Sequence, residues 1–419
     1  MTTKRYGVVV LMVLLSIMSY FDRTIMSIVG PAIVKEFSLS ETQMGALYSA
    51  FLLTYALLLV PGGQLADRFG PRVILTFSAL GAALFTGLTA LGGSPGLGAY
   101  VGIVPSFLAI RLCLGVFTAP LYPACAKMNA NWVPLTQRAR VWGWIACGAG
   151  IGGAVSPILF SGMIERYGWR TAFWIAGFAT AAVGIAWFLY ARDYPPQRAE
   201  VLERKIEPAP PTPWKKLLTN RDLVLLTISY AAVAYFEYIF FYWLYYYYGQ
   251  IRHMGTSQTA AYTTAVWLAW VVMTPIGGWV SDRMAVVYGP GRGRRIVPII
   301  GLTLSSILLC VGLNLTQPLA IAALMCLSLG FASSSDGSYW ASTISVGGEH
   351  VGAACGILNS GGNVGGFLAP VLTAYIASRV GWTWALYGGA FMVMVGVVSW
   401  FFIGAESSVR KKVASRSSV

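Results

Sequence analysis

Ionisable residues stand inside long apolar stretches of this chain, and they are the residues best suited to chemistry. These residues are Asp22, Arg23, Arg111, Glu237 and Asp336. One ionised side chain at bilayer depth costs about 2.5–3.5 kcal/mol, so such groups usually face a bundle interior or a wet cavity. They would form a substrate or ion site; the alternative is a set of buried pairs that fixes helix packing.

The two arginines predict an anion site. Arg111 lies near the middle of its apolar stretch and shares one helical face with Gly115, Thr118 and Tyr122. The planar guanidinium group matches two oxygens of a carboxylate or phosphate. Its alternative role is an internal pair with Asp22 or another acid, which a substrate would displace. Adjacent helical residues point about 100° apart, so Asp22 and Arg23 should contact different neighbours.

The three acids are candidates for ion coupling. Glu237 has aromatic neighbours, whereas serines surround Asp336. Burial disfavours an ionised carboxyl group, so either residue could carry a proton. Asp336 could alternatively help bind Na⁺. Both could instead be packing residues. If all of them are ionised, the two arginines and three acids inside the spans carry a small net negative charge. An entering anion should therefore bind cooperatively with a proton or cation.

Composition places these residues in a membrane. The 419-residue chain is 57% hydrophobic and only 11% charged, against about 25% charged in soluble domains. Apolar runs of helical length exclude a β-barrel. Most of the 29 Lys and Arg fall on one side of the predicted spans, which puts both termini in the cytoplasm. The net charge of +14 therefore reflects topology and not nucleic-acid binding.

Hydropathy predicts an all-α protein with twelve transmembrane helices. The spans are roughly 6–33, 43–66, 73–94, 101–126, 140–163, 169–191, 222–248, 257–280, 296–315, 318–345, 353–377 and 382–404. A polar, proline-rich segment divides them into a six-helix bundle over 1–191, a cytoplasmic linker over 192–221 and a second six-helix bundle with a short basic tail over 222–419.

The two halves are internal copies. The segment Gly62–Arg68 returns as Gly277–Arg283, 215 residues later. Gly152-Gly153 and Arg166-Tyr167-Gly168-Trp169 return with an offset of 213, at Gly365-Gly366 and Arg379-Val380-Gly381-Trp382. Duplicated bundles that flank a midplane site are typical of secondary transporters.

The loop Gly63-x-Leu65-Ala66-Asp67-Arg68-Phe69-Gly70-x-Arg72 resembles the signature of the major facilitator superfamily. Together with Tyr20-Phe21-Asp22-Arg23, Ser49-Ala50-Phe51 and Pro61-Gly62-Gly63, it resembles the anion:cation symporter family within that superfamily. That group carries sugar acids, other organic anions, phosphate and glutamate. The resemblance implies that Tyr55, Trp340 and an asparagine lie near the substrate. Many members have a glutamate where this chain has Thr118, so their coupling scheme cannot be transferred intact.

Further polar residues complete the predicted machinery. The candidate substrate ligands are Arg23, Arg111, Tyr48, Tyr55, Tyr122, Trp340, Asn359 and Asn363. A cytoplasmic gate is predicted at Asp67, Arg68, Arg72, Asp282 and Arg283, whose charges suit helix ends. The alternative is a static charge cluster that sets topology.

These features predict a monomeric transporter of a bacterial inner membrane and not an enzyme. It would move a small organic anion, a carboxylate or sugar acid, by alternating access in symport with protons. The alternatives are Na⁺-coupled anion transport, export or exchange of cationic or amphipathic compounds through Glu237 and Asp336, and a non-transporting receptor. No cofactor or metal motif is present in the sequence.

Overall fold

The computed structural model describes residues 3–94, 100–133, 137–195 and 214–404, most of which are helical. Eleven of the helices are long and apolar enough to cross a membrane. A further helix, α15 (Val351–Val380), is continuous over 30 residues, but its glycines and asparagines make it less apolar. Helices suit this setting because they satisfy their own backbone hydrogen bonds within lipid. The chain is therefore an all-helical, multi-pass membrane protein.

The chain separates into two compact units. One comprises Met1–Pro208 with Tyr248–Thr264, and the other comprises Ala209–Tyr247 with Ala265–Val419. The predicted division into two six-helix halves joined by a linker stays a prediction. Part of that linker, residues 196–213, and the basic tail, residues 405–419, lie outside the described residues.

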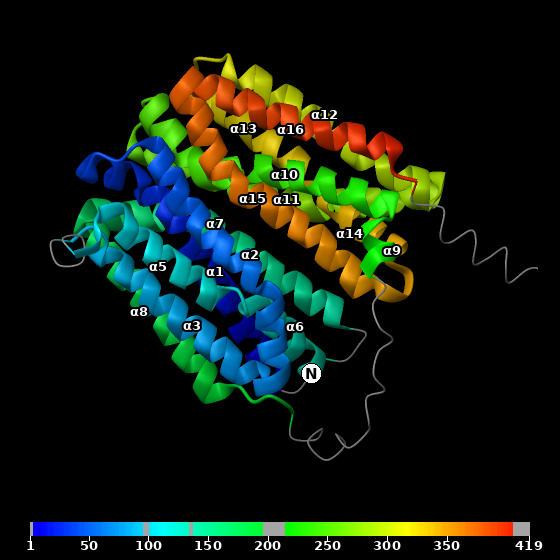
Figure 1. Ribbon diagram of the computed structural model, residues 1–419, viewed down its shortest axis with the longest axis horizontal. Coiled ribbons are helices and arrows are strands. Elements are labelled where there is room, and N and C mark those ends of the chain that lie inside the picture. Colours follow the sequence, from blue (N-terminus) through cyan, green and yellow to red (C-terminus); the bar gives the residue numbers. More distant parts are fainter. Residues whose placement is uncertain (1–2, 95–99, 134–136, 196–213, 405–419) are drawn as a thin grey trace, which may run out of the picture. The chain divides into compact units, whose positions relative to one another are not determined.

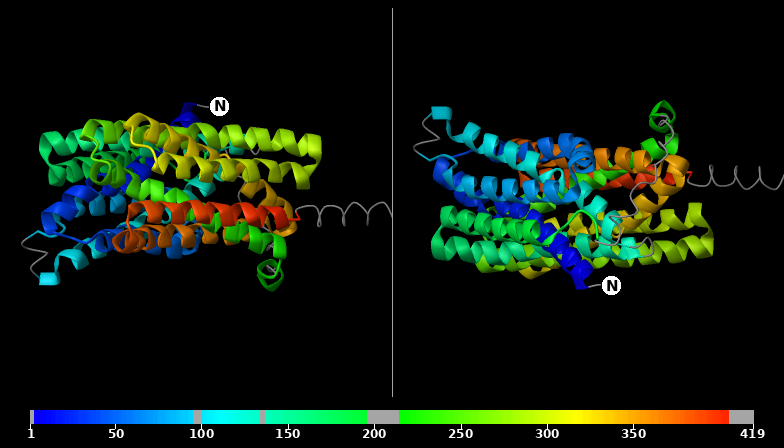
Figure 2. Two further views of the ribbon diagram at one scale, coloured as in Figure 1. Left: turned by 90° about the horizontal axis from the view of Figure 1, so that it is seen from above. Right: turned by 90° about the horizontal axis from the view of Figure 1, so that it is seen from below.

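In the first unit, α1 packs on α7 and α8, α3 packs on α8, and α2 packs on α5. Figure 1 shows these helices side by side, and both views of Figure 2 show that they run along a common direction. The helices are α1 (Thr3–Phe37), α2 (Glu41–Phe69), α3 (Pro71–Leu88), α5 (Ile103–Thr118), α6 (Leu121–Trp132), α7 (Arg138–Tyr167) and α8 (Trp169–Tyr190), with the 3-10 turn η1 (Thr89–Leu91).

In the second unit, α10 packs on α15 and α16, and α12 packs on α13 and α16. Its helices are α9 (Trp214–Leu218), α10 (Arg221–Tyr246), α11 (Thr256–Tyr288, from residue 265 on), α12 (Pro290–Leu313), α13 (Pro318–Ser333), α14 (Asp336–Gly347), α15 and α16 (Trp382–Phe402), with the 3-10 turn η5 (Gly348–His350). A π-helical turn, η4 (Tyr247–Ile251), follows α10.

Two spans that the sequence predicts as continuous helices are each broken. The span 101–126 divides into α5 and α6 at Ala119-Pro120, and the span 318–345 divides into α13 and α14 at Ser334-Ser335. Proline lacks the amide hydrogen that would continue the helix. At the second break, the Ser335 hydroxyl donates to the backbone carbonyl of Ala332 at 2.6 Å, which competes with helical bonding. The predicted continuity is wrong at these points, and the breaks fall at corresponding places in the two repeats.

Backbone geometry repeats between the units. Gly70 (φ 86°) and Gly289 (φ 85°) each join two helices and are followed by a proline in the first turn of the next helix. A positive φ favours glycine, and a helix tolerates proline best at its start. The sequence duplication is therefore also a duplication of local structure.

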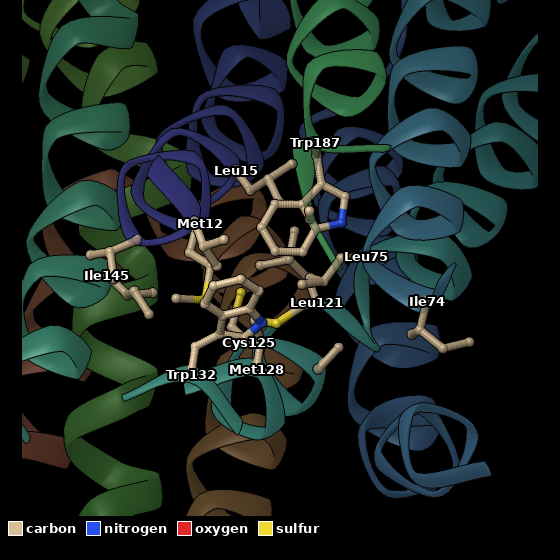
Figure 3. Close-up of a cluster of buried hydrophobic side chains, with 14 of the residues drawn as sticks. Met12, Leu15, Ile74, Leu75, Leu121, Cys125, Met128, Trp132, Ile145 and Trp187 are labelled. Carbon is tan, nitrogen blue, oxygen red and sulfur yellow. The ribbon is translucent and has the colours of Figure 1, made fainter. Parts of the chain in front are cut away.

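One end of the first unit is held by a cluster of buried apolar side chains. Figure 3 shows Met12 and Leu15 of α1 close to Trp187 of α8 and Leu121 of α6. The other labelled members are Ile74, Leu75, Cys125, Met128, Trp132 and Ile145. This cluster joins α1, α2, α3, α6, α7 and α8, and it holds α1, which carries Asp22 and Arg23.

Candidate functional site

In the first unit, Arg23 and Arg111 approach the same aromatic ring. The guanidinium carbon of Arg23 on α1 lies 5.4 Å from the centre of the Phe51 ring on α2, and that of Arg111 on α5 lies 5.1 Å from it. Arg23 is 7% exposed and Arg111 is 1% exposed. An aromatic face attracts cations by about 0.5–2 kcal/mol, so Phe51 helps to hold two like charges near each other.

Tyrosine rings extend this group. The guanidinium carbon of Arg23 lies 5.4 Å from the ring centre of Tyr20 and 5.5 Å from that of Tyr55. Tyr122 contacts the edge of Tyr20, with the ring centres 6.3 Å apart. Of the predicted tyrosine ligands, the structure thus brings Tyr55 and Tyr122 into the arginine group. Tyr48 of α2 lies against Gly30, farther along α1 than Arg23.

The sequence prediction did not assign a site role to Phe51. Its ring stacks on Tyr55 with centres 5.7 Å apart, and it is 1% exposed. A signal was available, because Tyr48, Phe51 and Tyr55 recur at the spacing of one helical face. The pattern could not show that two arginines from other helices meet at that face.

Asp22 contacts α3 and α8, whereas Arg23 lies against Phe51 of α2. Its Oδ2 atom accepts a hydrogen bond of 2.8 Å from the Thr180 hydroxyl of α8, and the side chains of Thr86 and Arg111 lie within interaction range. Asp22 is 3% exposed. The expectation that Asp22 and Arg23 contact different neighbours is confirmed. The two side chains therefore belong to different sets of contacts within the first unit.

The Thr118 side chain is engaged within its own helix. Its hydroxyl donates to the backbone carbonyl of Leu114 at 2.7 Å. Threonine has no proton to exchange at ordinary pH, so an acid elsewhere is needed if this chain couples transport to protons.

A second group of residues lies in the second unit around Glu237 and Asp336. The indole of Trp270 on α11 donates to Glu237 of α10. Trp340 donates to Oδ1 of Asp336 at 3.2 Å, and the Tyr230 hydroxyl also hydrogen-bonds that carboxyl group. The two acids lie within electrostatic range of each other. The structure therefore brings Glu237, Asp336 and Trp340 together in a frame of aromatic donors.

The predicted asparagines lie on α15, and at least one of them makes a local contact. The Asn363 amide donates to the backbone carbonyl of Asn359 at 3.0 Å. Both side chains are partly buried. On the same helix, Gly362 lies against the ring of Tyr230.

The predicted gate residues are distributed over both units. The Arg72 guanidinium donates to the carbonyl of Phe188 at 2.8 Å, and its backbone N–H donates to Oδ1 of Asp193 at 2.8 Å. Arg68 is exposed with its guanidinium carbon 5.3 Å from the Phe69 ring centre. In the second unit, Asp282 and Arg283 are exposed. The side chain of Asp67 lies outside the described part of the structure.

Within the described ranges, His, Cys, Asp and Glu form no group of three or more that could hold a metal ion. The chemistry available at both groups is therefore that of guanidinium, carboxyl, hydroxyl and aromatic side chains.

The sequence of this chain matches a known protein family. The model of the Major Facilitator Superfamily matches residues 12–345 and 292–418. The chain is 28% identical to the probable sulfoacetate transporter SauU of Cupriavidus necator, over 90% of this chain and 88% of that protein. It is 27% identical to the hexuronate transporter of Bacillus subtilis, over 93% of this chain and 91% of that protein.

Among solved structures, the fold matches a bacterial homologue of the human lysosomal transporter Spinster in an inward-facing and occupied conformation. The TM-score is 0.78 at 16% identity, over 96% of this chain and 97% of that chain. At this level of identity the likeness concerns the fold alone.

Proposed function

Because this chain belongs to the Major Facilitator Superfamily, we propose that it is a secondary transporter that moves a small organic anion by alternating access. The observation that carries the substrate class is the buried pair Arg23 and Arg111 around Phe51. Two guanidinium groups that converge on one buried ring bring together N–H donors from which a small anion would accept hydrogen bonds.

The chemistry of the pair favours a carboxylate, a sugar acid or a similar planar oxyanion. Guanidinium groups bind two oxygens of such an anion through parallel N–H donors. The rings of Tyr20, Tyr55 and Tyr122 lie beside them, and their hydroxyls would contact the polar body of the substrate, the Tyr122 hydroxyl in exchange for its 3.0 Å hydrogen bond to Ser16. The relatives' names, a sulfoacetate transporter and a hexuronate transporter, support this class.

We further propose that the anion moves together with protons in the direction of import. The acids inside the spans, Asp22, Glu237 and Asp336, would carry the coupling charge, because Thr118 cannot. Arg68 and Arg72, with Asp282 and Arg283, would contribute to the cytoplasmic gate. The protein would reside in a bacterial inner membrane with both termini in the cytoplasm, as the distribution of Lys and Arg favours.

Uptake by proteoliposomes tests this proposal. The purified protein is assayed with labelled sulfoacetate and with D-glucuronate, a hexuronate, under an inward proton gradient. We expect at least one of these anions to accumulate, and we expect Arg111→Ala to abolish both its binding and its uptake. Arg111→Lys should retain part of the affinity, because it keeps the charge but loses the two-pronged geometry.

Arg170→Ala is the matched control, because Arg170 is an exposed arginine of the same unit that pairs with Glu36 at 2.7 Å. It should leave uptake near that of the unsubstituted protein. A monodisperse Arg111→Ala protein with unchanged affinity would remove Arg111 from the site. A different result would support export or exchange of cationic compounds. In that case the protein would take up an organic cation in place of either anion, and neutralising Glu237 and Asp336 would abolish this uptake.

A further inference from the structure

An apolar groove runs along the first unit between α1 and α7. Side chains within residues 6–14 of α1 and 144–151 of α7 line it, and its volume is about 300 Å³. Several of them are exposed, among them Val10 at 56%, Trp144 at 44% and Ile151 at 40%. Both helices are long and apolar enough to cross a membrane, so the groove lies on membrane-spanning segments.

Close packing of α1 on α7 forms the floor of this groove. Gly148 lies against the backbone carbonyl of Val13, and Gly152 lies against that of Ile17. The two contacts are four residues apart on both helices, so α1 and α7 run parallel and in register. Continued toward the helix starts, this register brings the beginning of α1 level with the beginning of α7.

Basic residues gather at that end of the groove. Lys4 and Arg5 immediately precede the groove residues of α1, and Arg138 and Arg140 stand in the first turn of α7. The register of the two helices puts Arg5 level with Arg140. The buried Nε atom of Arg5 has no hydrogen-bond partner among the described residues. The free N–H groups at two helix starts add positive partial charge.

Acidic residues do not offset this charge along the groove. The first acid of α1 is Asp22, and the first of α7 is Glu165. The end of α8 also reaches the start of α1, where the Tyr190 hydroxyl donates to the Lys4 carbonyl at 3.5 Å. The next acid after Tyr190 is Asp193, whose carboxylate accepts the backbone N–H of Arg72 on α3. The groove therefore has a positive end and an apolar body.

The length of α1 sets the depth of the groove in the bilayer. Arg5 and Lys35 stand 30 residues apart on this helix, or about 45 Å, which matches a bilayer with its headgroups. Arg5 therefore lies at the level of the lipid phosphates of one leaflet. The groove itself extends about 12 Å along α1, close to the depth of the hydrocarbon in one leaflet.

This combination fits a phospholipid with a negatively charged headgroup. Its acyl chain would lie against the apolar walls, and its phosphate would accept hydrogen bonds from basic side chains at the end of the groove. Basic pockets between transmembrane helices bind anionic headgroups in this way. A helix of a second protein, at least 10 Å across, is too wide for a groove of about 300 Å³.

We propose that the groove between α1 and α7 binds one anionic phospholipid, with its acyl chain in the groove and its phosphate on Lys4 and Arg5. Binding is noncovalent, so no bond is made or broken. The bound lipid bridges the helix that carries Asp22 and Arg23 to α7. This inference depends on the membrane-spanning fold and not on which substrate the protein moves.

Photochemical labelling tests the site in a bilayer. The full-length protein is placed in phosphatidylcholine vesicles with a trace of phosphatidylglycerol that carries a photoactivatable group in one acyl chain. We expect adducts in peptides that cover residues 6–14 and 144–151, in higher yield than with phosphatidylcholine carrying the same group. Each basic residue near a membrane surface strengthens binding of an anionic lipid about fivefold, so the double variant Lys4→Gln, Arg5→Gln should lower the yield about thirtyfold.

Matched variants separate this site from general effects. The double variant Lys215→Gln, Lys216→Gln removes the same charge from exposed positions of α9 and should leave the yield unchanged. Cys147→Phe places a ring in the groove and should lower the yield, whereas Ile158→Phe, at a 51% exposed position of α7 outside the groove, should not. Peptides that cover a second apolar groove, formed by α10, α15 and α16, should label alike in all variants and so report intact folding.

Several results would overturn the proposal. Equal yields from the two probes, or an equal fall in the Lys215 and Lys216 variant, would exclude a specific headgroup contact. Undiminished labelling of Cys147→Phe would exclude the acyl chain from the groove. Displacement of the probe by excess glycerol 3-phosphate would indicate a site for a soluble phosphate, and a groove without adducts in a dimeric protein would assign it to a second copy. None of these results depends on transport, so they are independent of the proposed function.

Discussion

Arg111 of α5 and Phe51 of α2 meet with 5.1 Å between the guanidinium carbon and the ring centre, and Arg23 of α1 approaches the same ring at 5.4 Å. The residues belong to three helices, so the arrangement depends on how these helices pack. A ring shared by two guanidinium groups limits their separation, and under the proposed function this separation would determine which anion both could reach. The first prediction concerns this ring.

Replacing Phe51 by Leu should weaken anion binding while the protein still folds. Leucine keeps most of the buried volume but removes the aromatic face that orients both arginines, an attraction worth about 0.5–2 kcal/mol. We expect KM for uptake to rise between about twofold and thirtyfold. Phe117→Leu removes a ring of the same unit that stacks on Phe85 at 5.4 Å and should leave KM unchanged. Equal KM values for the Phe51→Leu and unsubstituted proteins would contradict the role of the ring.

Replacing Thr180 by Val should destabilise the first unit through Asp22. The change keeps the shape of the side chain but removes the hydroxyl that donates to Asp22 at 2.8 Å. Leaving a buried acceptor without its donor costs about 1–3 kcal/mol, which should appear as a lower thermal midpoint of the purified protein.

The effect should be specific to this hydrogen bond. Thr180→Ser retains the donor and should restore most of the stability, and Thr180→Val should cost much less in an Asp22→Ala background, which lacks the acceptor. Thr76→Val is a matched control, because the Thr76 hydroxyl bonds the carbonyl of Arg72 in its own helix at 2.9 Å. If Thr180→Val lowers the thermal midpoint equally with and without Asp22, the hydroxyl acts on some other group.

Replacing Asp193 by Ala should loosen the start of α3. Its carboxylate accepts the Arg72 N–H at 2.8 Å, beside Gly70 and at the positive end of the helix dipole. Loss of a helix cap costs about 0.5–2 kcal/mol. Hydrogen exchange followed by mass spectrometry should show faster exchange in peptides that cover residues 70–76. Asp193→Asn keeps an acceptor and should change exchange less; unaltered exchange in the alanine variant would refute the capping role.

Replacing Gly152 by Val should prevent normal packing of α1 on α7. A Cβ atom at this position would overlap the backbone carbonyl of Ile17, which cannot move without shifting the helix. We expect a large loss of monodisperse protein in size-exclusion chromatography. Gly162→Val on the same helix is the control, since nothing lies within 4 Å of a Cβ there. Similar yields of both variants would mean that α1 and α7 separate easily.

The helical, membrane-spanning character and the duplication follow from sequence because both depend on local patterns. Hydropathy over a window of one span identifies a helix in lipid, and the recurrence of Gly62–Arg68 at Gly277–Arg283 reports a repeat without coordinates. The predicted boundary near Gly70 agrees within a few residues, since a glycine followed by proline ends one helix and starts another. The predicted spans 257–280 and 296–315 stop short of Gly289, because the charged segment between them is helical in the structure. The helix breaks at Pro120 and Ser335 were missed, because a short interruption hardly changes the mean hydropathy of a span.

The sequence alone determined that costly ionic residues lie within apolar helices, and so that Arg23, Arg111, Asp22, Glu237 and Asp336 need partners. Only the tertiary structure decided which partners they have: Phe51 for both arginines, Thr180 for Asp22, and Trp270, Trp340 and Tyr230 for the acids of the second unit. The physical reason is that the composition of a helix fixes its burial in lipid, whereas its rotation and depth are fixed by packing against helices distant in sequence.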